Sequence, residues 1–167
     1  MGLLHGPRAY PKIYEKYYDR FNIYDDRAAW EASIESIPLA AVHLWSIHWL
    51  HLEVYNGGFW QFFANSTGVL AFEARDGFAV IEMPEVANVI RRAMEKLGEP
   101  YLVERKDRLK KLEELEKLDV NWDKEDTDFY NLADTEKLFR RVPKFVPFAD
   151  AYAYAYAQKH LGLGKGS

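Results

Sequence analysis

The sequence contains no cysteine. Disulfide bonds, thiolate ligation of zinc or iron–sulfur clusters and a thiol nucleophile are therefore excluded. The chain also lacks any stretch that approaches the roughly 18 uninterrupted apolar residues of a membrane span. Its first residues, MGLLHGPRAYPKIYEKYYDRF, show no charged start followed by a long apolar run. We therefore expect a cytoplasmic protein with no membrane partner.

Motifs for catalysis and cofactor binding are missing as well. The terminal GLGKGS does not follow a strand and lacks the spacing of a phosphate-binding loop. No nucleophile elbow surrounds Ser33, Ser36, Ser46 or Ser66. The sequence thus predicts no cofactor and favours a non-catalytic protein over an enzyme.

A strong excess of charge of either sign is absent. The chain has 22 basic and 26 acidic residues, which gives a formal net charge of −4. Counterion release from phosphates drives non-specific binding to nucleic acids and requires a basic surface. We therefore expect no direct binding to nucleic acid.

What the chain does contain is typical of one globular domain. Its 167 residues can enclose a sizeable core, and 49% of them are hydrophobic. Aromatic residues make up 16% of the chain, and we expect most of them in the core rather than at an interface. We predict a single domain over residues 1–167.

Helical periodicity extends along almost the whole chain, and no long run of period-two alternation occurs. Proline and glycine separate the apolar stripes, as at Pro38, Pro84 and Gly98. The pattern predicts an all-α, multi-helix bundle. The expected helices cover residues 10–21, 26–37, 38–56, about 59–64, 70–82, 84–97, 102–118, 134–142 and 147–160, with a long loop at 119–128 and a flexible tail at 161–167.

One segment, EVYNGGFWQFFANSTG, resembles the signature of a bacterial family of uncharacterised domains that includes a DNA-mimic protein. The second motif of that family is similar to the segment from Asp128 to Leu132, and the family-like region covers about 37–157. The residues that carry the first motif are Asn56, Gly57, Gly58, Phe59, Gln61, Phe62, Phe63, Asn65 and Gly68. The resemblance implies an all-helical homodimer whose acidic surface copies the charge pattern of DNA and occupies the DNA-binding face of a regulator.

Read from its residues alone, this motif is mainly structural. Asn56 and the two glycines form a tight turn between helices, and the phenylalanines anchor the short helix that follows. The amides of Gln61 and Asn65 share a helix face and could satisfy backbone groups at the turn. The alternative is a small-ligand or enzymatic pocket lined by aromatic and amide side chains, namely Trp45, Trp49, Phe59, Gln61 and Asn65.

The histidines His43, His48 and His51, with Glu53 nearby, are the remaining candidates for metal ligands. At about 100° per residue, His48 and His51 share a face whereas His43 points elsewhere. No H-E-x-x-H pattern occurs. We therefore predict no metal site and hydrogen-bonded, partly buried histidines.

Charge is strongly segregated in the second half of the chain. Residues 113–136 contain ten carboxylates and two lysines, a net charge of −8, whereas residues 104–111 carry a net charge of +3. Such runs are commonly solvated helix faces, and the alternative is an acidic docking surface for a basic protein. The candidate binding residues are Glu113, Glu114, Glu116, Asp119, Asp123, Glu125, Asp126 and Asp128. Together with the resemblance, they favour a protein-interaction domain of the DNA-mimic type.

Overall fold

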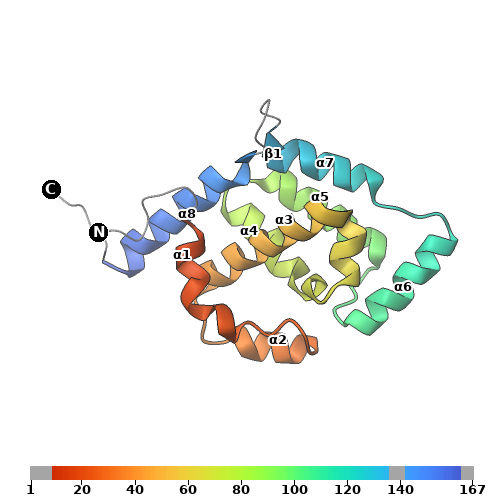
Figure 1. Cartoon of the computed structure of the whole chain (residues 1–167), viewed down its shortest axis with the longest axis horizontal. Helices are drawn as coiled ribbons and strands as arrows, with labels where there is room; N and C mark the ends of the chain where they lie inside the picture. Colours follow the sequence, from red (N-terminus) through yellow and green to blue (C-terminus); the bar gives the residue numbers. More distant parts are fainter. Residues whose placement is uncertain (1–8, 136–141, 163–167) are drawn as a thin grey trace.

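The computed structural model of the chain describes residues 9–135 and 142–162. Helices dominate these residues, and the all-α fold class predicted from the sequence is confirmed (Figure 1). In chain order the elements are α1 (Pro11–Tyr14), the 3₁₀ helix η1 (Glu15–Arg20), α2 (Arg27–Ile34), α3 (Leu39–Ala64), the 3₁₀ helix η2 (Ser66–Leu70), α4 (Ala71–Val80), α5 (Pro84–Leu97), α6 (Arg105–Lys117), α7 (Asp123–Ala133), β1 (Asp134–Thr135), β2 (Val142–Pro143) and α8 (Phe145–His160).

Helix α3 runs through the middle of the molecule and packs against α1, α4, α6, α7 and α8 (Figure 1). Its side chains are apolar on almost every face, which is why most of its length is buried. The helix is broken where the sequence predicts a turn, because Gly57 and Gly58 have non-helical backbone angles. The segment after the break, which begins at Phe59, therefore leaves in a new direction.

The core is one continuous cluster of buried hydrophobic side chains. Phe129 of α7 makes edge-to-face contacts with Phe59 of α3 and Phe78 of α4, with ring centroids 5.7 and 5.9 Å apart. At the other end of α3, Trp45 stacks on Phe21 and Trp30, with ring centroids 4.1 and 5.8 Å apart. These aromatic rings join helices that are distant in sequence.

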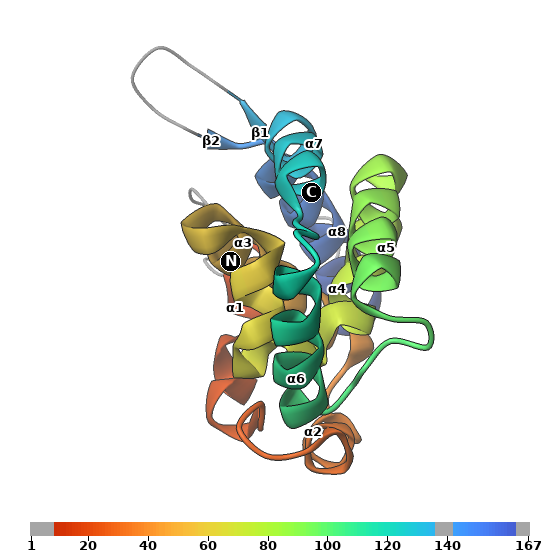
Figure 2. The ribbon, with the colours of Figure 1, turned by 90° about the vertical axis from the view of Figure 1, so that its right-hand side faces the viewer.

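Helices α5 and α6 carry the sharpest sequence signals. Pro84 begins α5 as predicted, and the N–H of Gly98 caps its end by donating to the Met94 carbonyl. Helix α6 buries Leu112 and Leu115 and exposes its charged face to solvent. Figure 2 shows α6 across one end of the molecule, between α3 and α5, and α6 packs against both helices.

Two expectations about the C-terminal third are wrong. The acidic segment 119–128 is not a long loop, because α7 begins at Asp123 after a short turn in which Asp119 has φ +56°. Its acidic first turn suits a helix N-terminus, where the macrodipole favours negative charge. The predicted helix 134–142 is replaced at its ends by β1 and β2, which pair antiparallel with Asp134 opposite Pro143. Residues 136–141 of that prediction, and 163–167 of the predicted tail, lie outside the described residues.

Candidate interaction surface

The break in α3 is held in place by a carboxylate of α7. Gly58 adopts φ 72° and ψ −177°, a conformation that is essentially restricted to glycine. The N–H of Phe59, at the start of the new helical segment, donates to Asp126 Oδ1 at 2.8 Å. A Cβ atom on Gly58 would lie 2.3 Å from Asp126 Oδ2. We call this break at Gly57 and Gly58 the elbow of α3. Position 58 requires glycine both for its backbone angles and because the capping carboxylate of Asp126 approaches so closely.

The polar residues of the motif converge on one carboxylate, that of Glu53. Gln61 Nε2 and Asn65 Nδ2 donate to Glu53 Oε2 at 2.7 and 2.9 Å. Thr67 Oγ1 donates to Glu53 Oε1 at 2.8 Å, and Asn56 Nδ2 donates to Gln61 Oε1 at 3.2 Å. The amides therefore bind a side-chain carboxylate, in contrast to the backbone groups expected from the sequence. Glu53 joins the segments on either side of the elbow.

Replacing Glu53 with glutamine is expected to lower the free energy of unfolding by about 1–3 kcal/mol. The NH₂ group of the new side chain would face hydrogen-bond donors of Gln61, Asn65 or Thr67 and could not accept from them. The measurement is urea denaturation followed by circular dichroism. Glu35→Gln, an exposed position at the end of α2, is the matched control and should remain near wild type. Equal stability of the two variants would show that Glu53 does not hold the elbow.

The C-terminal end of α3 is capped by a fully buried arginine from α6. Arg108 donates to the carbonyls of Phe63 at 2.8 Å and Asn65 at 3.0 Å, and also to that of Val103. Burial lowers the pKa of Arg108 from its usual range. The partial negative charge at a helix C-terminus favours such a cation. A Cβ atom on Gly68 would lie 2.6 Å from Arg108 Nε, so this glycine of the motif makes room for the guanidinium.

Three of the eight predicted acidic binding residues already have partners within the chain. Glu125 is buried and forms an ion pair with Lys96 of α5. Asp126 caps the α3 elbow, and burial is the main cause that raises its pKa. Asp128 pairs with Lys124 at 2.7 Å and with Arg92 at 2.6 Å, and its hydrogen bond to Lys124 is the main cause that lowers its pKa.

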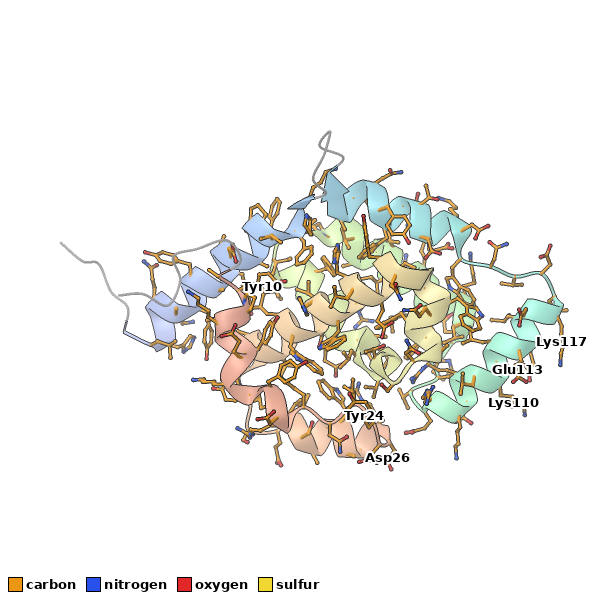
Figure 3. The ribbon with its side chains drawn as sticks, viewed as in Figure 1. Tyr10, Tyr24, Asp26, Lys110, Glu113 and Lys117 are labelled. Atoms are coloured by element: carbon orange, nitrogen blue, oxygen red, sulfur yellow. The ribbon has the colours of Figure 1, made fainter. Side chains whose placement is uncertain are left out.

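The other five carboxylates are exposed on the second half of α6 and at the turn into α7, and we call this set the acidic corner. It consists of Glu113, Glu114, Glu116, Asp119 and Asp123. Among the described residues, Glu114 is its only member in an ion pair, with Lys111 at 3.5 Å. Figure 3 shows Glu113 between Lys110 and Lys117 at the outer edge of the molecule. Leu118, which is 71% exposed, lies within the corner.

The three histidines of α3 lie in different environments. Tyr10 Oη and His48 Nδ1 form a hydrogen bond of 3.0 Å. His51 stacks on Tyr55 with ring centroids 5.6 Å apart. Burial lowers the pKa of His43, against smaller opposing effects of Asp76 and Glu73. Within the described residues, no group of three or more histidine or carboxylate side chains is placed to hold a metal ion.

Acid is expected to destabilise the fold through His43. Its folded pKa lies below the unfolded value of about 6.5, so the unfolded chain takes up the proton first as the pH falls. The contribution to stability is present above about pH 6.5 and is lost below it. Denaturation at pH 7 and pH 5 should therefore show a smaller loss in His43→Gln than in wild type. His160→Gln, at the exposed end of α8, should keep the wild-type loss, and an unchanged loss in His43→Gln would exclude His43 as its source.

The residues of the alternative pocket make separate contacts. Trp45 and Trp49 pack together with ring centroids 6.1 Å apart, and their indole N–H groups have no hydrogen-bond partner among the described residues. Phe59 is fully buried against Phe63 and Phe129, and the two amides of the motif are occupied by Glu53.

The family model of the DMP19-like proteins matches residues 35–160, from the end of α2 to the end of α8. The chain belongs to this family. No curated protein and no solved structure matches it significantly. The matched residues include the elbow of α3, the caps formed by Asp126 and Arg108, and the acidic corner. None of the helices described here is both long and apolar enough to cross a membrane.

Two interactions of the DMP19-like chain were missed at the level of sequence. The first is the cap by Arg108, although this residue follows the spacing of Leu112 and Leu115 on the buried stripe of α6. The second is the buried carboxylate of Glu73, which pairs with Arg27 at 2.7 Å and accepts a hydrogen bond from Trp30 Nε1 at 3.1 Å. A charged residue on an apolar stripe is the signal that could have revealed Arg108.

Proposed function

We propose that the chain is a non-catalytic protein-interaction domain of the DNA-mimic type, which binds the basic surface of a DNA-binding protein. The observation that carries the proposal is the acidic corner, because four of its five carboxylates have no ion pair among the described residues. These charges are available to lysine and arginine side chains of a partner. Complementary charge speeds association and selects the partner.

The order of charges along α6 further supports this proposal. Its first turn has Arg105 and Lys106 beside one acid, Asp107, whereas its last turn has Glu114 and Glu116 beside one base, Lys117. A helix macrodipole favours the opposite order, by about 0.3–1 kcal/mol for each charge near an end. Helix stability therefore does not explain the excess of acidic residues at the end of α6, which supports a role for them in binding.

The corner also includes an apolar side chain. Leu118, between Glu116 and Asp119 in the sequence, is exposed and can add apolar contact to the charged contacts of a partner. Five carboxylates are few compared with the phosphates of duplex DNA, which has one charge per roughly 1.7 Å of its axis. We propose that a homodimer presents two corners together, as a two-fold axis would allow. The chain itself, with its net charge of −4, does not bind duplex DNA.

The test is charge reversal at the corner, with Glu113, Glu116, Asp119 and Asp123 all replaced by lysine. We expect wild-type protein to capture a basic DNA-binding protein from its native cell extract, and salt to release it because screening weakens exposed charge pairs. The reversed variant should not capture that protein. Its matched control reverses four exposed carboxylates elsewhere, namely Glu15, Asp19, Glu35 and Glu85.

Three results would contradict the proposal. The reversed variant could retain the same protein as wild type, the matched control could lose it equally, or the captured protein could lack DNA-binding activity. Circular dichroism of both variants ensures that a loss of capture does not reflect a loss of folding.

A further inference from the structure

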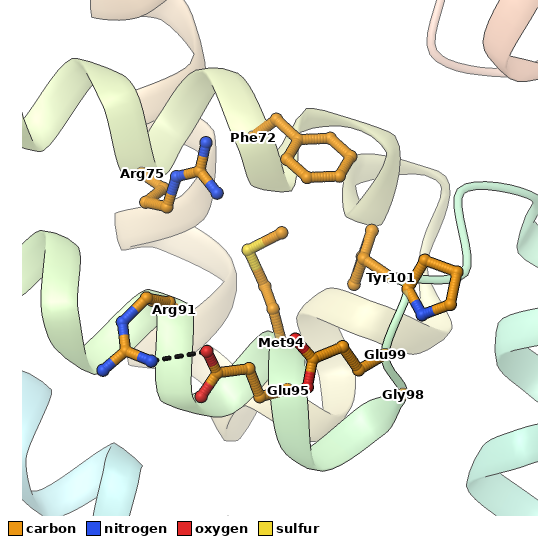
Figure 4. A pocket seen from close by; sticks show the side chains of 9 residues that line it. Phe72, Arg75, Arg91, Met94, Glu95, Gly98, Glu99 and Tyr101 are labelled. Carbon is orange, nitrogen blue, oxygen red and sulfur yellow. Dashed lines mark hydrogen bonds and ion pairs between the residues drawn. The ribbon is translucent and has the colours of Figure 1, made fainter.

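A groove lies between α4 and α5, near the segment that leads into α6, and has a volume of about 570 Å³ (Figure 4). This volume falls within the usual range of small-ligand sites. None of its residues belongs to the acidic corner or to the motif of α3. The residues that line it are Phe72, Arg75, Arg91, Met94, Glu95, Gly98, Glu99, Pro100 and Tyr101.

The interior of the groove is apolar and is held by fixed rings. Phe72 and Tyr101 meet edge to face with ring centroids 5.5 Å apart, and the hydroxyl of Tyr101 donates to the Gly68 carbonyl at 2.8 Å. In Figure 4, the side chain of Met94 lies in the middle of the groove, between Arg91 and Tyr101. A methionine side chain adapts its shape to what it contacts. The groove can therefore accept an aliphatic or aromatic group.

Two arginines stand at one end of this apolar interior. Arg75 comes from α4 and Arg91 from α5, and Glu99 lies toward the other end beside Gly98 (Figure 4). The guanidinium of Arg75 lies 5.3 Å from the ring centroid of Phe72, so it lies against the apolar lining.

The partners of both guanidiniums come from their own helices. Arg75 pairs with Asp76 at 2.8 Å, and Arg91 pairs with Glu95 and also bonds Asn88. Solvent screens such surface pairs, so they hold the arginines weakly. Each guanidinium has five N–H donors and keeps some of them for a second, bidentate acceptor.

We infer that this groove binds an amphipathic carboxylate. The apolar group lies against Phe72, Met94 and Tyr101, and the carboxylate accepts hydrogen bonds from Arg75 and Arg91. In the same orientation, a cationic ligand would place its charge against two guanidiniums, and only the reverse orientation would bring that charge beside Glu99. The carboxylate can belong to a free aliphatic or aromatic acid or to the C-terminal residue of a peptide. The inference is independent of the acidic corner.

The test uses the methyl resonances of methionine, because the chain has three methionines and only Met94 lines the groove. The full chain, labelled at its methionine methyl groups, is titrated with octanoate, octanol and octylammonium. Octanoate should shift the Met94 resonance to saturation and bind at least about tenfold more tightly than octylammonium, as expected for charge-assisted hydrogen bonds. Met83, a core residue at the start of α5, is the internal reference and should not move.

Arginine variants then test the site of the carboxylate. Arg75→Gln and Arg91→Gln together should weaken octanoate binding at least about tenfold. Lys159→Gln, at the exposed end of α8, removes one charge elsewhere and should leave binding unchanged. The inference is overturned if Met94 does not respond to octanoate, if octylammonium binds equally well, or if the double variant binds octanoate as wild type does.

A last pair of probes identifies the source of the carboxylate. N-acetyl-Ala-Ala-Phe with a free C-terminus is compared with its carboxamide and with octanoate. Tighter binding of the free peptide than of octanoate, with loss in the carboxamide, assigns the groove to peptide C-termini. Tighter binding of octanoate assigns it to free acids. Measurable and equal affinity of the groove for the peptide and for its carboxamide would contradict recognition of a carboxylate.

Discussion

Replacement of Gly58 with valine is expected to lower the free energy of unfolding by about 3–5 kcal/mol. The backbone angles of Gly58 are open to glycine and strongly unfavourable for a β-branched residue. Its Cβ would also lie 2.3 Å from Asp126 Oδ2, so the cap on Phe59 would have to move. Strain of about 1–3 kcal/mol and overpacking of a similar size sum to about 2–6 kcal/mol, and the expected loss lies in the middle of this range.

The measurement is thermal unfolding, in which this loss corresponds to a fall of about 6–20 °C in melting temperature for a chain of this size. Gly98→Ala is the matched control, because Gly98 has an extended backbone and its added Cβ would meet other atoms only at 3.6 Å or more. It should unfold near the wild-type temperature. A wild-type melting temperature in Gly58→Val would refute the structural role assigned to the elbow.

Replacement of Arg108 with methionine is expected to cost about 3–5 kcal/mol of stability. The variant keeps an apolar stem in the core but leaves the carbonyls of Phe63, Asn65 and Val103 without their donor. A buried polar group without a partner costs about 1–3 kcal/mol. Arg108→Lys should lie between wild type and methionine, because an ammonium retains the charge but lacks the planar fork.

Urea denaturation measures these differences, with Lys106→Met as the control. Lys106 is exposed in the same turn of α6, so its replacement should change stability by no more than about 0.5 kcal/mol. If Arg108→Met were as stable as Lys106→Met, the guanidinium would not be the cap that fixes the end of α3.

The fold was predictable where a local signal is strong. Pro84 and Gly98 bound α5 because proline and glycine act on the backbone at their own positions. The paired glycines at 57 and 58 break α3 for the same reason. The start of α7 was missed because a run of carboxylates resembles a solvated loop, although acidic residues also favour a helix N-terminus.

The candidate site was predictable only as a region of charge. Counting carboxylates cannot separate Asp126, which caps an N–H 67 positions earlier in the chain, from Asp123, which is exposed. Such separation depends on packing between α3 and α7, which no local pattern contains. The same holds for Glu53, whose donors lie 8 to 14 residues further along the chain and beyond the elbow.

The proposed function is tested most directly by competition on the captured DNA-binding protein. Labelled duplex DNA is bound to that protein, and the fluorescence anisotropy of the DNA is followed as the chain is added. A DNA mimic should release all of the DNA, whereas the variant reversed at Glu113, Glu116, Asp119 and Asp123 should release none. A complex that contains the partner, the chain and the DNA together would contradict the proposal, because two ligands of one surface cannot be bound at the same time.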